Sequence, residues 1–315
     1  MLRRAFLAAG TLAAGIHPAL AADPVKLVVP FPAGGSLDAI GRLLADKLKT
    51  PLGAPVIVEN RAGANGNIGA AAVAQMGGDG RTLLMGSDGV LTVNPLLYKA
   101  RSFNAAADLE PVGLVAYVPS LLVVPAASPI RSIADFVATA RSRELFYASG
   151  GSGSAGHLTM AYFGSVIGAK LTHVPFSGGA PAILSVVGGQ VDAAFVALPN
   201  ALAQVKAGKL RAIAVSSLQR LPQLPEVATV AESGYQGFEV RTAYLLMSSS
   251  KLAANARSRL EAMLAAAAAS KDFQAHVDEL GMQPAWLDAR ETKAWLLSEQ
   301  KRWAGVIARH GISAN

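Results

Sequence analysis

Short runs of β-forming residues alternate with stretches of helical period along this 315-residue chain, and this alternation limits the fold more than any other feature. Residues 25–30, 82–87 and 210–215 are rich in Val, Leu and Ile, whereas residues 36–48 repeat apolar side chains every three or four positions. Strands separated by single helices form mainly parallel sheets whose two faces are covered by helices. The alternation therefore predicts an α/β fold.

Four predicted strand-to-helix loops are rich in glycine and other small residues. They cover residues 30–36, 60–66, 149–154 and 177–180. Glycine allows a ligand to approach the bare backbone, and the N-terminus of a helix presents unpaired N–H donors with a partial positive charge. Because ligands of open α/β sheets bind at the carboxyl ends of the strands, these loops are predicted to bind a small anion.

Two enzyme alternatives arise from the third loop. Residues 151–156 fit the dinucleotide pattern G-x-G-x-x-G, but no acidic residue follows before Asp192, and the ribose needs one about 20 positions later. Ser154 with His157 or His173 is the best candidate for a hydrolase, although Ser154 is not part of a G-x-S-x-G motif. A periplasmic hydrolase that uses Ser154 and His157 is therefore the alternative function. No metal or cofactor is expected, since no two histidines after the first 22 residues have the i, i+4 spacing of a helical metal site.

The first 22 residues have the pattern of a secretory signal peptide. Arg3 and Arg4 precede an apolar stretch at 5–16, and the small-x-small pattern of Ala19-Leu20-Ala21-Ala22 suits a signal peptidase. The apolar stretch is shorter than the ~20 residues that a membrane-spanning helix needs. Paired arginines also occur in twin-arginine signals, so the Sec and twin-arginine routes both stay open. We expect export to the periplasm.

The composition restricts the partners and the chemistry. The chain has no cysteine, which excludes disulfides, a lipid-anchoring cysteine and a cysteine nucleophile. Hydrophobic residues make up 52% of the chain and charged residues 16%, a composition that excludes a disordered protein. The formal charge of +7 falls to +5 without Arg3 and Arg4, and the basic residues are scattered rather than clustered with aromatic ones. A nucleic-acid partner is therefore not expected.

Ordered motifs over nearly the whole chain after residue 22 indicate a family. They are VPFPAGGS at 29–36, VENRAG at 58–63, GNIGA at 66–70, NPLLY at 94–98, HVPF at 173–176, GQVD at 189–192, KAGKLR at 206–211 and PEVATVAESG at 225–234. In these motifs the sequence resembles the substrate-binding receptors of tripartite tricarboxylate transporters, also called Bug receptors.

This resemblance implies a two-lobed periplasmic binding protein of type II-like architecture, with parallel-rich sheets flanked by helices. The chain would cross between the lobes twice, near 117–121 and 241–245. The expected segments are a signal peptide at 1–22, lobe 1 at 23–119 and 244–315, and lobe 2 at 120–243.

The resemblance also implies binding without catalysis. A small carboxylate would bind in the cleft between the lobes, mainly through backbone amides and ordered water. Permease subunits of a tripartite tricarboxylate transporter are the expected partners, and the receptor is expected to act as a monomer. The expected ligand-binding residues are Phe31, Pro32, Ala33, Gly34, Gly35, Ser36, Leu37, Asp38, Ser87, Ser149, Gly150, Ser152, Gly153, Ser154, His157, Gly179, Ala180 and Val196.

Leu37 and Val196 depart from the family pattern, which commonly has a polar residue at both positions. The departures predict either a more apolar distal end of the pocket or two side chains that simply pack beneath the loops. An enclosed ammonium group would need a compensating carboxylate, and among the residues of these loops only Asp38 and Asp88 are acidic. We therefore expect an apolar or aromatic carboxylate to bind more tightly than glutamate or aspartate.

Overall fold

The computed structural model describes residues 23–76, 78–98 and 103–313. The predicted signal peptide, residues 1–22, lies outside the described residues. Within the described residues, no helix is both long enough and apolar enough to cross a membrane.

The N-terminal part folds into a group of three parallel strands with helices between them. Its elements are β1 (Val25–Val29), α1 (Ser36–Leu52), β2 (Val56–Asn60), the 3-10 turn η1 (Ala64–Gly66), α2 (Asn67–Met76), β3 (Thr82–Ser87), α3 (Gly89–Thr92), α4 (Asn94–Leu97) and α5 (Ala105–Asp108). β1 lies between β2 and β3. Because successive side chains of a strand point to opposite faces, Leu27 and Val29 pack in one cluster with Ile40 of α1, and Val28 packs in another with Val73 of α2.

The middle part repeats this plan. Its elements are α6 (Ile133–Ser142), β5 (Leu145–Ser149), α7 (Ala155–Val166), β6 (Leu171–Pro175), α8 (Gly179–Val187), β7 (Ala193–Ala197), α9 (Leu198–Lys206) and β8 (Leu210–Val215). β5 pairs in parallel with β6 and β7. Phe195 packs edge-on against Phe163 of α7, with 5.7 Å between ring centroids, while its neighbour Ala194 lies in the cluster that contains Ile183 of α8. Helices again cover both faces.

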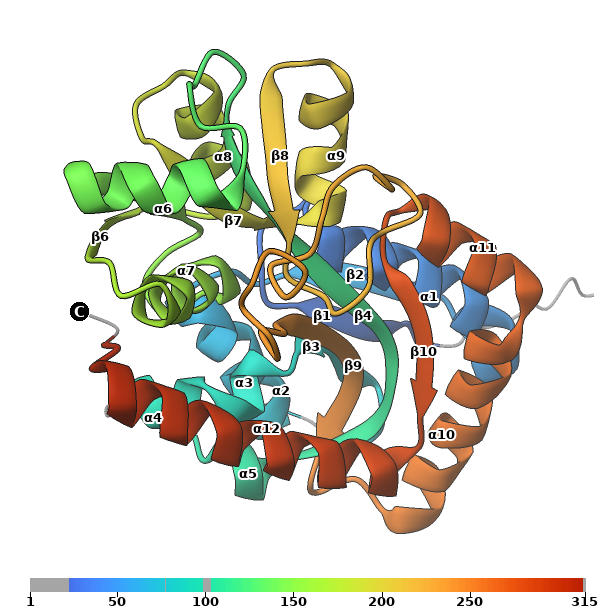
Figure 1. Cartoon of the computed structure of the whole chain (residues 1–315). Helices are drawn as coiled ribbons and strands as arrows, with labels where there is room; N and C mark the ends of the chain where they lie inside the picture. The colour runs from blue at the N-terminus through green and yellow to red at the C-terminus, as the bar shows by residue number, and fades with distance from the viewer. Residues whose placement is uncertain (1–22, 77, 99–102, 314–315) are drawn as a thin grey trace, which may run out of the picture.

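Two long antiparallel strands, β4 (Leu109–Pro125) and β9 (Arg241–Ser249), join the two groups. β9 pairs with β3 and with β4 as far as Pro119, and from Ser120 onward β4 pairs with β7 and β8. The strand order is β2-β1-β3-β9-β4-β7-β5-β6, and β4 runs through the middle of the molecule in Figure 1. The predicted α/β class is confirmed. The change of partners at Pro119 and Ser120 falls inside the first predicted crossing.

The C-terminal segment consists of α10 (Ala254–Ala269), α11 (Lys271–Glu279), β10 (Gln283–Leu287) and α12 (Ala289–His310). The Asp288 side chain accepts a hydrogen bond from the Glu291 amide, and the Glu291 side chain accepts one from the Asp288 amide, so α12 begins at a complete capping box. Leu296 packs with the cluster of α2, whereas Trp303 and Val306 pack with the cluster of α7. Figure 1 shows α12 running below the sheet as far as α7. The last helix therefore contacts both strand groups, although the sequence assigns it to lobe 1 alone.

Candidate functional site

The four glycine-rich loops come together in space. A Cβ added to Gly150 would lie 3.2 Å from the backbone of Gly178, and one added to Gly178 would lie 3.7 Å from Cγ of Pro32. A Cβ added to Gly66 would lie 3.5 Å from the ring of Phe31. The loops after β1, β2, β5 and β6 thus lie side by side, at the carboxyl ends of their strands, where the sequence predicts an anion site.

Asp38 shapes the first loop. Its carboxylate accepts hydrogen bonds from the Gly34 amide, from Nε of Arg42 and from Nδ2 of Asn60, each at 3.0 Å. Nδ2 of Asn60 also donates to the carbonyl of Phe31 at 3.1 Å. Burial alone would raise the pKa of Asp38, but the bonds from Arg42, Gly34 and Asn60 outweigh it and keep the pKa below its ordinary value. Asp38 is therefore a buried anion that already accepts three hydrogen bonds from the protein.

The N-terminus of α1 lacks a side-chain cap of its own. Its N-cap is Gly35, in extended conformation, and no side-chain capping bond from that residue is present. The hydroxyl of Ser36 is engaged with the hydroxyl of Tyr244 at 2.7 Å, and Tyr244 pairs with Ser87 between β9 and β3. The Ser36 amide donates instead to Oδ1 of Asn200, at 3.1 Å. An oxygen atom from a distant segment thus occupies a position where a ligand carboxylate could bind.

A neutral network shapes the loop after β5. The Gly153 amide donates to Nδ1 of His157 at 3.0 Å, and the hydroxyl of Ser149 lies 2.6 Å from Nε2 of His173. The two imidazole rings stack with 4.0 Å between their centroids. Burial, with the neighbouring His173, lowers the pKa of His157 to about 4, and burial also lowers the pKa of His173. Both rings are therefore neutral near pH 7, and Nδ1 of His157 is a hydrogen-bond acceptor.

The same contacts argue against the hydrolase alternative. Nδ1 of His157 is occupied by the Gly153 amide rather than by the hydroxyl of Ser154. That hydroxyl caps α7 by accepting from the backbone amide of His157, at 3.4 Å. A serine nucleophile needs its hydroxyl within hydrogen-bond reach of an imidazole nitrogen. In this structure the hydroxyl of Ser154 therefore serves as a helix cap.

Asn65 and Tyr98 connect the first strand group to the loop after β5. Nδ2 of Asn65 donates to the carbonyl of Gly153 at 2.8 Å, and the hydroxyl of Tyr98 donates to the carbonyl of Ser152 at 2.6 Å. Asn65 has a left-handed backbone, with φ of 50°, and its side chain is also hydrogen-bonded to the buried Asn94. Asparagine tolerates this conformation better than most residues.

The sequence-based list of site residues omits Asn65, Tyr98, Asn200 and Tyr244. Each of these side chains contacts a loop far away in the chain, so no local pattern identifies it.

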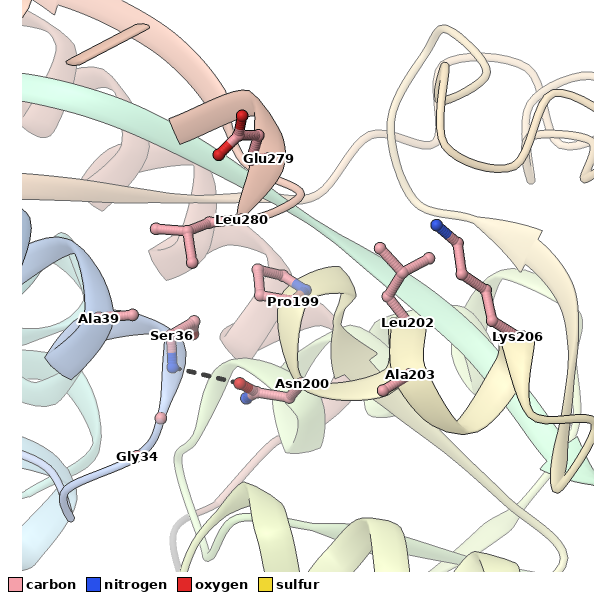
Figure 2. Close-up of a pocket in the computed structure, with 11 residues that line it drawn as sticks. Gly34, Ser36, Ala39, Pro199, Asn200, Leu202, Ala203, Lys206, Glu279 and Leu280 are labelled. Atoms are coloured by element: carbon pink, nitrogen blue, oxygen red, sulfur yellow. Dashed lines mark hydrogen bonds between the residues drawn. The ribbon is translucent and has the colours of Figure 1, made fainter. Parts of the chain in front are cut away.

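A cavity of about 390 Å³ adjoins the first loop. The first loop contributes Gly34, Gly35 and Ser36 to its wall, and α9 contributes Asn200 and Lys206. Glu279 and Leu280 close another side, and Figure 2 shows the Ser36–Asn200 contact at the wall between α1 and α9. Residues 149–154 do not line this cavity.

Leu37 and Val196 are both buried in hydrophobic clusters. Leu37 is 4% exposed and packs with Ile40, and Val196 is 7% exposed and packs with Leu121. Neither side chain lines the cavity. The apolar distal wall inferred from these two residues stays a prediction.

The remaining predicted residues border the loops. Pro32, Ala33 and Ala180 are exposed to solvent. Gly179 begins α8, and a Cβ added to it would lie 3.2 Å from Nδ2 of Asn200. The carboxamide of Asn200 therefore lies between the N-termini of α1 and α8.

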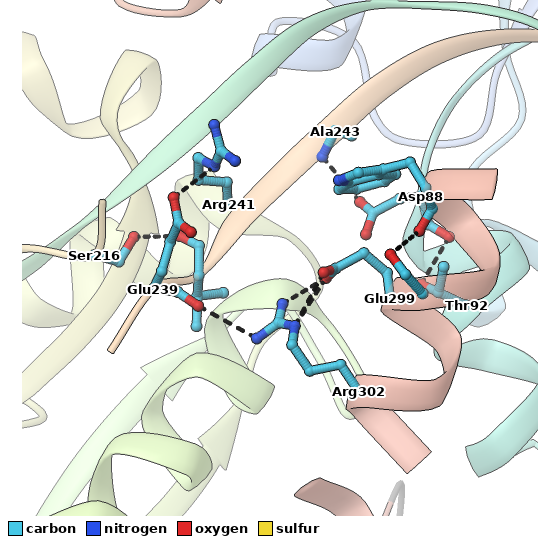
Figure 3. Close-up of polar contacts among 11 residues, drawn as sticks. Asp88, Thr92, Ser216, Glu239, Arg241, Ala243, Glu299 and Arg302 are labelled. Carbon is cyan, nitrogen blue, oxygen red and sulfur yellow. Dashed lines mark hydrogen bonds and ion pairs between the residues drawn. The ribbon is translucent and has the colours of Figure 1, made fainter. Parts of the chain in front are cut away.

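The second acidic loop residue, Asp88, is buried beside β9. One of its oxygens accepts from the Ala243 amide at 3.0 Å, and burial raises its pKa to about 7. Near it, Arg302 of α12 pairs with Glu299 and donates to the carbonyl of Glu239, as Figure 3 shows. Asp88 is thus bonded to the start of β9, whereas Arg302 connects α12 to the segment just before β9. Among the described residues, no group of three or more His, Asp or Glu side chains could bind a metal ion.

Comparison with known proteins gives matches over most of the chain. A family model described as the tripartite tricarboxylate transporter family receptor matches residues 40–312. The UPF0065 protein in the tcbD-tcbE intergenic region of a Pseudomonas species is 38% identical over 296 residues, which cover 93% of this chain and 88% of that protein. Protein BugT of Bordetella pertussis is 34% identical over 310 residues, 95% of this chain and 94% of that protein.

Solved structures match equally far along the chain. Rpa4515 of R. palustris with adipate has a TM-score of 0.88 at 32% identity, and the periplasmic binding protein BugD has 0.85 at 32%; each match covers 92% of this chain and 98% of the other. MatC of Rhodopseudomonas palustris with bound malate has a TM-score of 0.81 at 27% identity and covers 90% of this chain and 98% of that one.

Proposed function

Because the chain belongs to the tripartite tricarboxylate transporter receptor family, a family of binding proteins rather than enzymes, we propose that it is a periplasmic receptor for a small aliphatic dicarboxylate. The observation that carries the proposal is the N-terminus of α1. It has no side-chain cap of its own, and its Ser36 amide donates to a carboxamide oxygen as it would to a carboxylate.

The proposed binding mode uses the two loops that face each other. Amides of the loop after β1 would bind one end of the ligand, and amides and hydroxyls of the loop after β5 would bind the rest, with ordered water between. The segments 23–119 with 244–315 and 120–243 would act as two lobes, joined by β4 and the start of β9. Asn65 and Tyr98 would keep the lobes closed, since both donate from the first lobe to carbonyls of the second.

The ligand class follows from the acidic residues of the loops. Asp38 accepts from Gly34, Arg42 and Asn60, and Asp88 is buried against Ala243. Because both side chains are buried, neither is exposed to the ammonium group of an amino acid at the loops. Relatives with adipate and malate support a dicarboxylate with an uncharged carbon chain.

The partner and the location complete the proposal. The predicted signal peptide at 1–22 and the likeness to the periplasmic binding protein BugD support export to the periplasm. There the receptor, as a monomer, would deliver its ligand to permease subunits of a tripartite tricarboxylate transporter.

A thermal-shift series on residues 23–315 tests the proposal. The acids are succinate, malate, adipate, citrate, benzoate, glutamate and aspartate, with hexanoate as the matched control that lacks one carboxylate of adipate. A ligand at about 100 times its Kd adds about 2.7 kcal/mol of stability, which raises the Tm by several degrees. No shift with any dicarboxylate, or consumption of the added acid, would contradict the proposal.

A further inference from the structure

Asn200 is the partner of the Ser36 amide, but the proposed binding mode gives its side chain no role. It lies in the first turn of α9, next to Pro199 and the buried Leu198. Its Oδ1 accepts the hydrogen bond of the Ser36 amide at 3.1 Å, across a sequence separation of 164 residues. A side chain of the middle part of the chain thus contacts the first helix of the N-terminal part.

The Ser36 amide is open to such a partner because nearby side chains are engaged elsewhere. The hydroxyl of Ser36 is bound to Tyr244, and the carboxylate of Asp38 accepts from Gly34, Arg42 and Asn60. Gly35, at the N-cap, has no side chain that could accept a hydrogen bond. A carboxamide oxygen and a carboxylate oxygen accept the same bond from an amide, so Asn200 occupies the position that a ligand would need.

The surroundings of Asn200 allow its side chain to leave. The cavity of about 390 Å³ lies directly beside the contact, between α1 and α9, as Figure 2 shows. Within the described part of the chain, a single hydrogen bond fixes Oδ1, and Nδ2 faces the backbone at Gly179. Rotation of the side chain into the cavity would uncover the Ser36 amide.

We propose that Asn200 is an internal competitor of the ligand: its carboxamide covers the Ser36 amide in the empty protein and is displaced when a carboxylate binds. This inference rests on the proposed function, because it assigns an end of the ligand to that amide. It makes Asn200 a residue that sets affinity without being required for binding.

Calorimetric titration of adipate into Asn200 variants tests the competition. Asn200→Ala removes the competitor and should tighten binding about threefold to tenfold, the worth of one neutral hydrogen bond. Asn200→Asp places an anion at the same amide and should weaken binding more than tenfold. Gln204→Ala, on the same helix, is the matched control and should leave the affinity unchanged. Weaker binding in Asn200→Ala would overturn the proposal.

A measurement without ligand separates this inference from the proposed function. Hydrogen exchange of the Ser36 amide, followed by NMR, should accelerate about threefold to tenfold in Asn200→Ala and stay unchanged in Gln204→Ala. If the parent protein binds no dicarboxylate, the proposed function fails. The exchange rate still shows whether Asn200 protects the Ser36 amide. An unchanged exchange rate in Asn200→Ala would overturn the role of Asn200.

Discussion

The loops after β1 and after β5 have similar sequences but are held in shape by different chemistry. A buried carboxylate, Asp38, organises the first by accepting from Gly34 and Arg42. Two stacked neutral imidazoles organise the second, where His157 accepts from the Gly153 amide. Glycine alone therefore does not build an anion site. Each loop needs a second set of side chains that fixes its backbone, and these sets respond differently to mutation and to pH.

Substitution of the loop glycines is expected to have the largest effect on adipate affinity, and this effect should differ between the two loops. Gly153 has φ of +78°, and a Cβ added to it would lie 3.0 Å from the hydroxyl of Tyr98. A branched side chain there is strained by the backbone conformation and crowded by the tyrosine. Gly153→Val should therefore lose the bond to His157 and weaken adipate binding about a hundredfold.

Gly35→Val is the matched variant in the first loop. Gly35 is extended, and a Cβ there would meet the carbonyl oxygen of Pro32 at an ordinary 3.6 Å. It should therefore weaken binding less than Gly153→Val and change the Tm little. Calorimetric titration of adipate and melting curves of both variants check that Gly153→Val loses more affinity than Gly35→Val. Equal losses of affinity would contradict the proposed difference between the two loops.

The next largest effect is a change in the free energy of unfolding with pH, which comes from His157 in the second loop. The folded pKa of His157 is about 4, against an ordinary value of 6.5, so below pH 6.5 the unfolded chain binds a proton that the folded protein does not take up until about pH 4. The contribution of His157 to stability should therefore be complete above pH 6.5 and fall by about 3 kcal/mol as the pH drops towards 4. Asp88 acts in the opposite direction over nearly the same range, because burial raises its pKa to about 7 in the folded protein. Asp38 adds a loss only at lower pH, because its pKa is lowered.

His157→Asn should remove the contribution of His157 and leave that of Asp88, since asparagine does not titrate, so the variant should gain stability relative to the parent protein as the pH falls. Urea unfolding at pH 7, 5.5 and 4.5 measures it, with the exposed His276→Asn as the control that keeps the full dependence. An unchanged pH dependence in His157→Asn would contradict the assignment.

Local patterns in the sequence predict the fold better than the site. The capping box at Asp288 forms completely, because Glu291 is long enough to reach back to the Asp288 amide. At Ser132 the corresponding residue is Asp135, one methylene shorter, and it accepts from the Arg131 amide instead. Such bonds depend on residues three or four positions apart, which a sequence displays directly.

The contacts that complete the site are not local. Asn65, Tyr98 and Asn200 reach partners that are 88, 54 and 164 residues away, so their roles depend on how β4 and β9 place the two strand groups. The loops themselves follow from glycine and helix-start patterns. The sequence does not show where the side chains of Leu37 and Val196 point, because tertiary packing decides whether they lie in a core or line a pocket.

The smallest effects concern the two serines at the helix starts. Ser36→Ala leaves the buried hydroxyl of Tyr244 without this partner and should cost about 1–3 kcal/mol of unfolding free energy. Ser154→Ala removes a 3.4 Å capping bond and should cost about 0.5–1 kcal/mol. Urea unfolding of the two variants shows which one loses more unfolding free energy. Adding Tyr244→Phe to Ser36→Ala should restore part of the loss, and a larger cost for Ser154→Ala would reverse the comparison.

The most direct test of the receptor function is calorimetric titration of adipate against hexanoate and glutamate. The two loops together should bind adipate saturably with a stoichiometry of one. Hexanoate, which lacks one carboxylate, should bind about 10- to 100-fold more weakly, because it loses charge-assisted hydrogen bonds worth about 1.5–3 kcal/mol. Glutamate should also bind more weakly than adipate, since its ammonium group finds no free carboxylate at the loops. Equal affinity for adipate and hexanoate, or no saturable binding of either, would contradict the account.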